Sequence, residues 1–152
     1  LPMNRYEQLV AANDKSYIPG MLELDASEEE ITSIRRADRK AQGVTDEEER
    51  LAEKAIASNL EIKDDLIIVQ ALCSRFSPIC DRLFPYHKLL IYTDSEWMYY
   101  GDGCCSVRNL FADELLSGDL FYGGGEQGYV GVKQNVYKKD NIIEMINRIK
   151  NI

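Results

Sequence analysis

The stretch KLLIYTDSEWMYYGDG at residues 88–103 decides the fold class. Lys88–Thr93 and Glu96–Tyr100 are rich in aromatic and branched apolar residues, as strands are. Asp94-Ser95 between them is typical of a tight turn, so this stretch predicts two antiparallel strands. Gly101-Asp102-Gly103 predicts a further turn after the second strand.

A glycine-rich stretch follows at Phe121–Val132, with the sequence FYGGGEQGYVGV. Its Gly123-x-Gly125-x-x-Gly128 spacing is that of a phosphate-covering loop. A dinucleotide-binding loop leads into a helix, whereas this one leads into an expected strand at Tyr129–Tyr137. It resembles the glycine-rich hairpin of protein kinases, but no other kinase motif occurs in the chain. We therefore predict a structural hairpin turn with a bulge after a strand at Leu120–Tyr122.

Helices are predicted around these strands. Val107–Leu116 has a helical pattern, and Asp140 begins an amphipathic helix that ends the chain. Its expected core-facing residues are Ile142, Ile143, Ile146, and Ile149 or Met145. The apolar run Leu66–Val69 suits a strand by itself, but its continuation to Phe76 favours a buried helix over residues 64–76. Ser77-Pro78 then predicts the start of a short helix, with Ser77 as the N-cap.

The N-terminal half has few aromatic residues and clear helix signals. Ser27–Glu30 and Thr45–Glu48 each have the pattern of a capping box, in which a hydroxyl and a carboxylate satisfy free amides. The predicted fold class is α+β, with a helical N-terminal half packed with a small antiparallel sheet and a C-terminal helix. We expect one domain over residues 1–152, with a helical region at 1–62 and an α+β core at 63–152.

Charge and composition narrow the classes of partner. The 152 residues contain 18 Lys and Arg against 26 Asp and Glu, a formal charge of −8. This balance opposes direct binding to nucleic acid or an anionic membrane and favours a basic protein partner. No apolar run is long enough for a transmembrane helix, and Leu1–Arg5 lacks a signal-peptide segment. With sparse cysteines that we expect to be reduced, these features predict a cytoplasmic protein.

A thiol enzyme is one alternative. Cys104 or Cys105 would need His87 as a base, with Asp94 or Asp102 to orient it. No local signature supports this group, and free cysteines are mostly small buried apolar residues. We predict no catalytic residues.

A metal site is another alternative. Cys73, Cys80 and His87 are evenly spaced, but Pro78 and Pro85 interrupt any helix that would align them. The short ligand pairs typical of zinc sites do not occur in the sequence. We predict neither a metal nor a cofactor.

Aromatic residues on or beside the hairpins are the candidate partner-binding residues. In the strand that contains Trp97, that residue and Tyr99 should face one side, and Met98 and Tyr100 the other. These rings either lie between the sheet and the helices or form an interface, where tyrosine and tryptophan are favoured. The predicted partner-binding residues are Trp97, Tyr99, Tyr100, Tyr122, Glu126 and Tyr129.

The sequence thus predicts a non-enzymatic, acidic protein-binding module, of inhibitor or immunity-protein type, that docks on a basic partner. The alternative is a small-molecule or nucleotide-binding domain that uses the Gly123–Gly128 turn. In that alternative Tyr122 and Tyr129 stack on the ligand, and lysines lie near its phosphates; these are Lys133, Lys138 and Lys139. The oligomeric state is left open.

Overall fold

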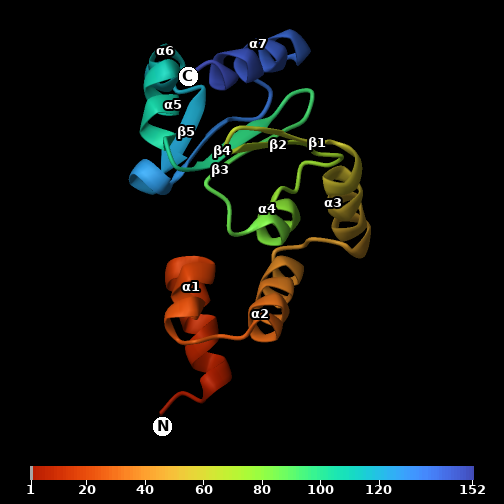
Figure 1. Ribbon diagram of the computed structural model, residues 1–152, viewed down its shortest axis with the longest axis vertical. Coiled ribbons are helices and arrows are strands. Elements are labelled where there is room, and N and C mark those ends of the chain that lie inside the picture. Colours follow the sequence, from red (N-terminus) through yellow and green to blue (C-terminus); the bar gives the residue numbers. More distant parts are fainter. Residues whose placement is uncertain (1) are drawn as a thin grey trace. The chain divides into compact units, whose positions relative to one another are not determined.

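The computed structural model describes residues 2–152, and the chain divides into two compact units, Leu1–Asp46 and Glu47–Ile152 (Figure 1). The first unit contains helices α1 (Arg5–Glu23) and α2 (Glu28–Ala41). The second contains a six-stranded sheet with the remaining helices. The α+β class is confirmed. That residues 1–152 act as one domain stays a prediction.

Both helices of the first unit begin at side-chain caps. The side chain of Asn4 accepts a hydrogen bond of 2.8 Å from the Glu7 amide at the start of α1. At α2, Ser27 Oγ accepts from the Glu30 amide at 3.1 Å, and the Glu30 carboxylate accepts from the Ser27 amide at 3.0 Å. This confirms the predicted capping box. The sequence did not predict α1, which is interrupted at Tyr17, where φ is 59°.

Polar contacts join α1 to α2. Arg5 Nε lies 3.0 Å from Glu30 Oε2, and Arg5 Nη2 donates to Glu30 Oε1 at 3.1 Å. The hydrogen bond from Arg5, with that from the Ser27 amide, lowers the pKa of Glu30 to about 2. Nearer the middle of the helices, Arg35 Nη1 donates to both Asp38 and Asn13. This network therefore satisfies buried polar groups of the first unit and is structural.

The sheet of the second unit has the strand order β1-β2-β3-β4-β6-β5. Strand β2 pairs in parallel with β3, and every other pair is antiparallel. The sheet is therefore mixed, and it is mostly antiparallel, as predicted. The strands are β1 (Leu60–Lys63), β2 (Leu66–Gln70), β3 (Lys88–Tyr92), β4 (Trp97–Gly101), β5 (Leu120–Gly123) and β6 (Tyr129–Val132).

Strand β2 corrects the prediction of a helix over residues 64–76. The strand lies between β1 and β3, and both of its faces are covered. Leu66 and Ile68 face one core, whereas Ile67 and Val69 face the other. A strand buried on both faces has no apolar–polar alternation, so its sequence can be mistaken for a buried helix. Helix α4 (Ser77–Leu83) follows, with Phe76 rather than Ser77 as its N-cap.

Helices cover both faces of the sheet (Figure 1). Helices α5 (Cys104–Leu110), α6 (Ala112–Leu116) and α7 (Lys139–Lys150) pack on one face, and α3 (Asp46–Ser58) and α4 on the other. The helix predicted at Val107–Leu116 is thus divided, at the buried Phe111. In α7, Ile142, Met145 and Ile149 are buried as predicted, whereas Ile143 is exposed, which corrects its assignment to the core.

None of the helices in residues 2–152 combines the length and the apolar character that crossing a bilayer requires.

Candidate binding surface on the β5–β6 hairpin

The glycine-rich stretch forms the turn between β5 and β6, as predicted. A short 3-10 turn, η1 (Gly125–Gln127), lies at its tip, and Gly124 and Gly125 have φ of 76° and 68°. A Cβ on Gly128 would lie 1.8 Å from the carbonyl oxygen of Gly123, so only glycine fits there. The glycines are therefore explained by the geometry of the chain. Strand β6 ends at Val132, earlier than the predicted Tyr137.

Two side chains of the turn bind the loop between β4 and α5. Glu126 Oε1 accepts a hydrogen bond of 3.0 Å from the backbone N–H of Gly103, which is the N-cap of α5. Gln127 Nε2 donates to Asp102 Oδ1, also at 3.0 Å. The tip of the hairpin is therefore held to the adjacent loop at two points.

Three aromatic side chains of the hairpin are exposed: Phe121 by 38%, Tyr122 by 52% and Tyr129 by 40%. The rings of Phe121 and Tyr129 are 6.3 Å apart, between centroids. Tyr122 points to the opposite face, where the guanidinium of Arg108 lies 3.8 Å from its ring centroid. These three residues, which we call the hairpin aromatic surface, therefore present apolar area on both sides of the sheet edge.

The predicted partner-binding residues fall into two groups. Trp97 and Tyr99 are 0% and 2% exposed and belong to the core beneath α5 and α7, so they have no surface to offer a partner. For these two, the alternative of rings packed between sheet and helices holds. Tyr100 is half-buried on the other face, whereas Tyr122, Glu126 and Tyr129 are exposed. Sequence reasoning missed Phe121, although its place in the predicted strand at Leu120–Tyr122, directly before the glycines, was the available signal.

The lysines predicted to bind phosphate lie away from the turn. Lys133, Lys138 and Lys139 follow β6, whereas the glycines precede it, so the length of the strand separates them. The carboxylates of Glu126 and Asp102 lie at the tip of the turn, and the guanidinium of Arg108 lies against Tyr122. A phosphate bound at the tip would meet the two carboxylates.

Neither cysteine of the thiol-enzyme alternative, Cys104 or Cys105, has the lowered pKa of a nucleophile. A hydrogen bond with the Glu126 carboxylate raises the pKa of Cys105, and burial raises the pKa of Cys104. Nucleophilic cysteines need a lowered pKa. His87 Nδ1 lies 3.4 Å from Asp102 Oδ2 and is largely exposed.

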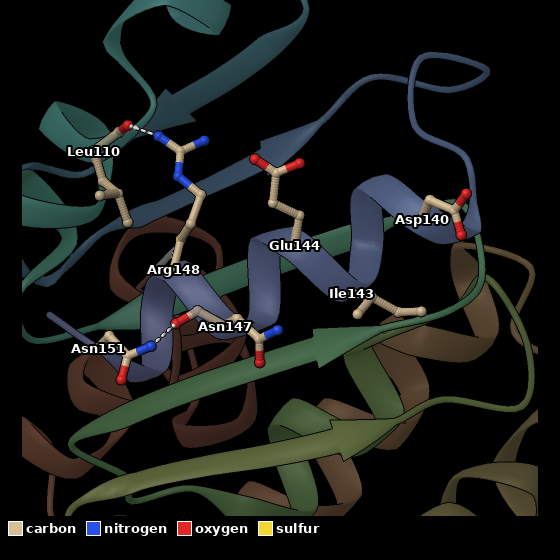
Figure 2. Close-up of a pocket in the computed structure, with 7 residues that line it drawn as sticks. All are labelled: Leu110, Asp140, Ile143, Glu144, Asn147, Arg148 and Asn151. Atoms are coloured by element: carbon tan, nitrogen blue, oxygen red, sulfur yellow. Dashed lines mark hydrogen bonds between the residues drawn. The ribbon is translucent and has the colours of Figure 1, made fainter.

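In residues 2–152, no three His, Cys, Asp or Glu side chains are grouped so that they could hold a metal ion. A shallow hollow of about 690 Å³ runs along α7 (Figure 2). Two of its polar side chains bind the protein itself: Arg148 donates to the carbonyl of Leu110, and Asn151 donates to that of Asn147. Its other polar lining residues, Asp140, Glu144 and Asn147, are spread along the exposed side of the helix.

Neither a protein-family model nor a curated protein matches this chain. The functional argument is therefore built on the geometry of the hairpin and on the charge of the chain.

Proposed function

We propose that this protein is a non-enzymatic binding module, of inhibitor or immunity-protein type, that docks on a basic protein through the hairpin aromatic surface. The observation that supports this proposal is the exposure of Phe121, Tyr122 and Tyr129 on a turn held by Glu126 and Gln127. Aromatic side chains on a fixed support supply contact area at a small cost in conformational entropy. They are also enriched among the residues that dominate binding energy.

Charge supplies the second part of the proposal. The formal charge of −8 attracts a basic partner over distances longer than direct contact. Near the hairpin, Asp119 precedes β5 and Asp102 lies beside the turn. Attraction of this kind speeds the encounter and selects the sign of the partner, while the aromatic rings hold the complex together.

Alanine substitutions test this proposal once the partner has been isolated by affinity purification from the native cell and identified by mass spectrometry. We expect Tyr122→Ala and Tyr129→Ala each to weaken binding of the purified partner by roughly tenfold, about 1.4 kcal/mol. Ile143→Ala is the matched control, because Ile143 on α7 is 52% exposed, as is Tyr122. Equal effects of all three substitutions, or none from the tyrosines, would refute docking through the hairpin.

The nucleotide-binding alternative stays a prediction, and the positions of Lys133, Lys138 and Lys139 do not favour it. A thermal-shift screen with nucleotides separates the two functions. A ligand present at a hundred times its Kd should stabilise the protein by about 2.7 kcal/mol. A shift of that size, abolished by Tyr122→Ala, would favour the nucleotide alternative over protein docking.

A further inference from the structure

The sheet of the second unit has two edge strands, β1 and β5. On the β5 side, the Lys133 amide donates to the Asp119 carbonyl at 2.9 Å, which makes residues 119 and 133 a hydrogen-bonded pair. Such pairs alternate along an antiparallel ladder, so Phe121 and Gly123 direct their backbone groups toward β6. The backbone N–H and C=O groups of Leu120 and Tyr122 therefore point to the outer edge of β5.

The two edges differ in their protection. Strand β1 contains Glu61, whose carboxylate lies 2.8 Å from Lys150 Nζ, and Lys63, whose ammonium donates to the Lys150 carbonyl. Strand β5, by contrast, has the sequence LFYG, with neither a charged residue nor a proline. Charged side chains and prolines are the usual means by which proteins block pairing at a free edge. Edge β5 lacks both.

We propose that an extended, basic segment of the partner adds to β5 as a further strand, with Leu120 and Tyr122 supplying the backbone pairing. This inference rests on the proposed function and specifies how the partner binds. Strand addition takes its affinity from main-chain hydrogen bonds and its specificity from alternate side chains. Of the two edges, β5 is the one that combines unblocked backbone groups with exposed aromatic rings.

An acidic pocket explains the basic character of the segment. The pocket, of about 220 Å³, includes Glu114, Asp119 and Glu144 beside the rings of Phe111 and Tyr137. Since Asp119 immediately precedes β5, the pocket opens at the start of that strand. Carboxylates beside aromatic rings favour a cationic side chain. Arg148 already lies 4.3 Å from the Phe111 ring centroid and 3.4 Å from Glu114, so a cationic side chain of the added segment would meet Asp119 and Glu144.

The opposite face of the same edge is apolar. Phe121 and Tyr129 lie on that face, where they are partly exposed. Because side chains alternate along a strand, the added segment should alternate basic residues with apolar ones. A second copy of this chain suits the edge less well, because pairing β5 with itself would bring two charges of −8 together.

Amide hydrogen exchange with two synthetic peptides tests this inference in the full chain. The first peptide alternates lysine and valine. The second alternates lysine and proline, with the same length and charge but without the ability to pair as a strand. We expect the first peptide alone to slow exchange at the Leu120 and Tyr122 amides by about tenfold, and to leave the inward-facing Phe121 amide unchanged.

Each other result overturns strand addition. Equal binding of both peptides without protection of the Tyr122 amide would mean that the peptides bind by charge alone. The strand mechanism would then be wrong, and the proposed function would stand. Binding of neither peptide at low salt would remove the strand mechanism, while the alanine variants with the isolated partner would still decide the function. Protection that rises with protein concentration alone would identify a second copy as the occupant.

A variant at position 122 adds a second test. Tyr122→Pro removes an amide that points outward, so the bonds between β5 and β6 are kept. It should abolish protection at Leu120 by the lysine–valine peptide, whereas Tyr122→Val, which keeps the amide, should retain it. Fluorescence of the buried Trp97 shows whether each variant is folded. If Tyr122→Pro is unfolded, the exchange pattern of Tyr122→Val decides, and loss of protection there contradicts main-chain pairing.

Discussion

The carboxylate of Glu126 accepts a hydrogen bond of 3.0 Å from the backbone N–H of Gly103. This contact joins the turn between β5 and β6 to Gly103, the N-cap of α5. Gly103 has no side chain with which to cap the helix itself. One acidic side chain thus fixes the turn beside the hairpin aromatic surface and satisfies an amide at a helix start. The sequence predicts a partner contact for Glu126, and this stays a prediction; within the chain its carboxylate binds Gly103 and Cys105.

Removing this carboxylate should loosen the tip of the hairpin. We expect Glu126→Ala to lower the free energy of unfolding by about 1 kcal/mol and to speed exchange of the Gly103 amide. Urea unfolding followed by Trp97 fluorescence gives the first quantity, and NMR-detected exchange gives the second. Glu126→Gln keeps an acceptor oxygen and should have a smaller effect. An unchanged exchange rate at Gly103 in the alanine variant would show that the contact does not hold the loop.

Alanine at two glycines of the turn should have unequal effects. A Cβ on Gly128 would meet the backbone of Gly123 at 1.8 Å, whereas a Cβ on Gly125 would have no neighbour within 4 Å. Gly125→Ala therefore carries only the strain of its positive φ, about 1 kcal/mol, and Gly128→Ala should cost clearly more. Urea unfolding of both variants compares them. Equal losses of stability would mean that the turn is not packed as described.

The thiol of Cys105 should react slowly with alkylating agents. The nearby Glu126 carboxylate raises the pKa of Cys105, so less thiolate is present at a given pH than in a free cysteine. Glu126→Gln should lower that pKa and speed alkylation at mildly alkaline pH. Rates with iodoacetamide measured against pH check both statements, and Glu114→Gln serves as the control. A rapid reaction of Cys105 in the unaltered protein would reopen the case for a reactive thiol.

The pair of Arg5 and Glu30 should make the first unit sensitive to acid. The pKa of Glu30 in the folded protein, about 2, lies below its ordinary value of 4.5. A carboxylate whose pKa is lowered by folding adds to the free energy of unfolding. This contribution is complete above pH 4.5 and declines as the pH falls toward 2. Glu30→Gln should abolish this part of the acid dependence, and Glu28→Gln should retain it.

NMR titration of the Glu30 carboxyl carbon in the full chain, with helix content followed by circular dichroism, measures this dependence. A midpoint near the ordinary value of 4.5 would contradict the contact with Arg5.

Local patterns in the sequence were sufficient for some elements. The capping box of Ser27 and Glu30 depends on residues three apart, and the sequence located α2 from it correctly. The strand that contains Trp97 and the glycine-rich turn were likewise predicted, because turn residues and alternation are local signals.

Other features depend on distant residues. The sequence predicts a helix at strand β2, because the Leu66–Val69 run is apolar on both faces and the elements that cover those faces are not part of the run. The parallel pairing of β2 with β3 likewise requires a crossover, which α4 occupies here.

The candidate site shows the same limit. Tyr99 and Tyr122 both lie on strands beside turns, but one is buried and the other is exposed. The difference arises from the position of each strand, because β4 is internal to the sheet and β5 is at its edge. Strand order is set by long-range pairing, so the sequence could name the aromatic residues without separating the core from the surface.

The central claim, that an acidic chain docks on a basic partner through its β5–β6 hairpin, is tested most directly by the rate of association with the isolated partner against ionic strength. Screening shortens the reach of the −8 charge from about 30 Å at about 0.01 M salt to about 3 Å at about 1 M. The account predicts a steep fall in the association rate over this range, with a dissociation rate that Tyr122→Ala raises. An association rate that does not change with salt, or a dissociation rate that Tyr122→Ala leaves unchanged, would contradict it.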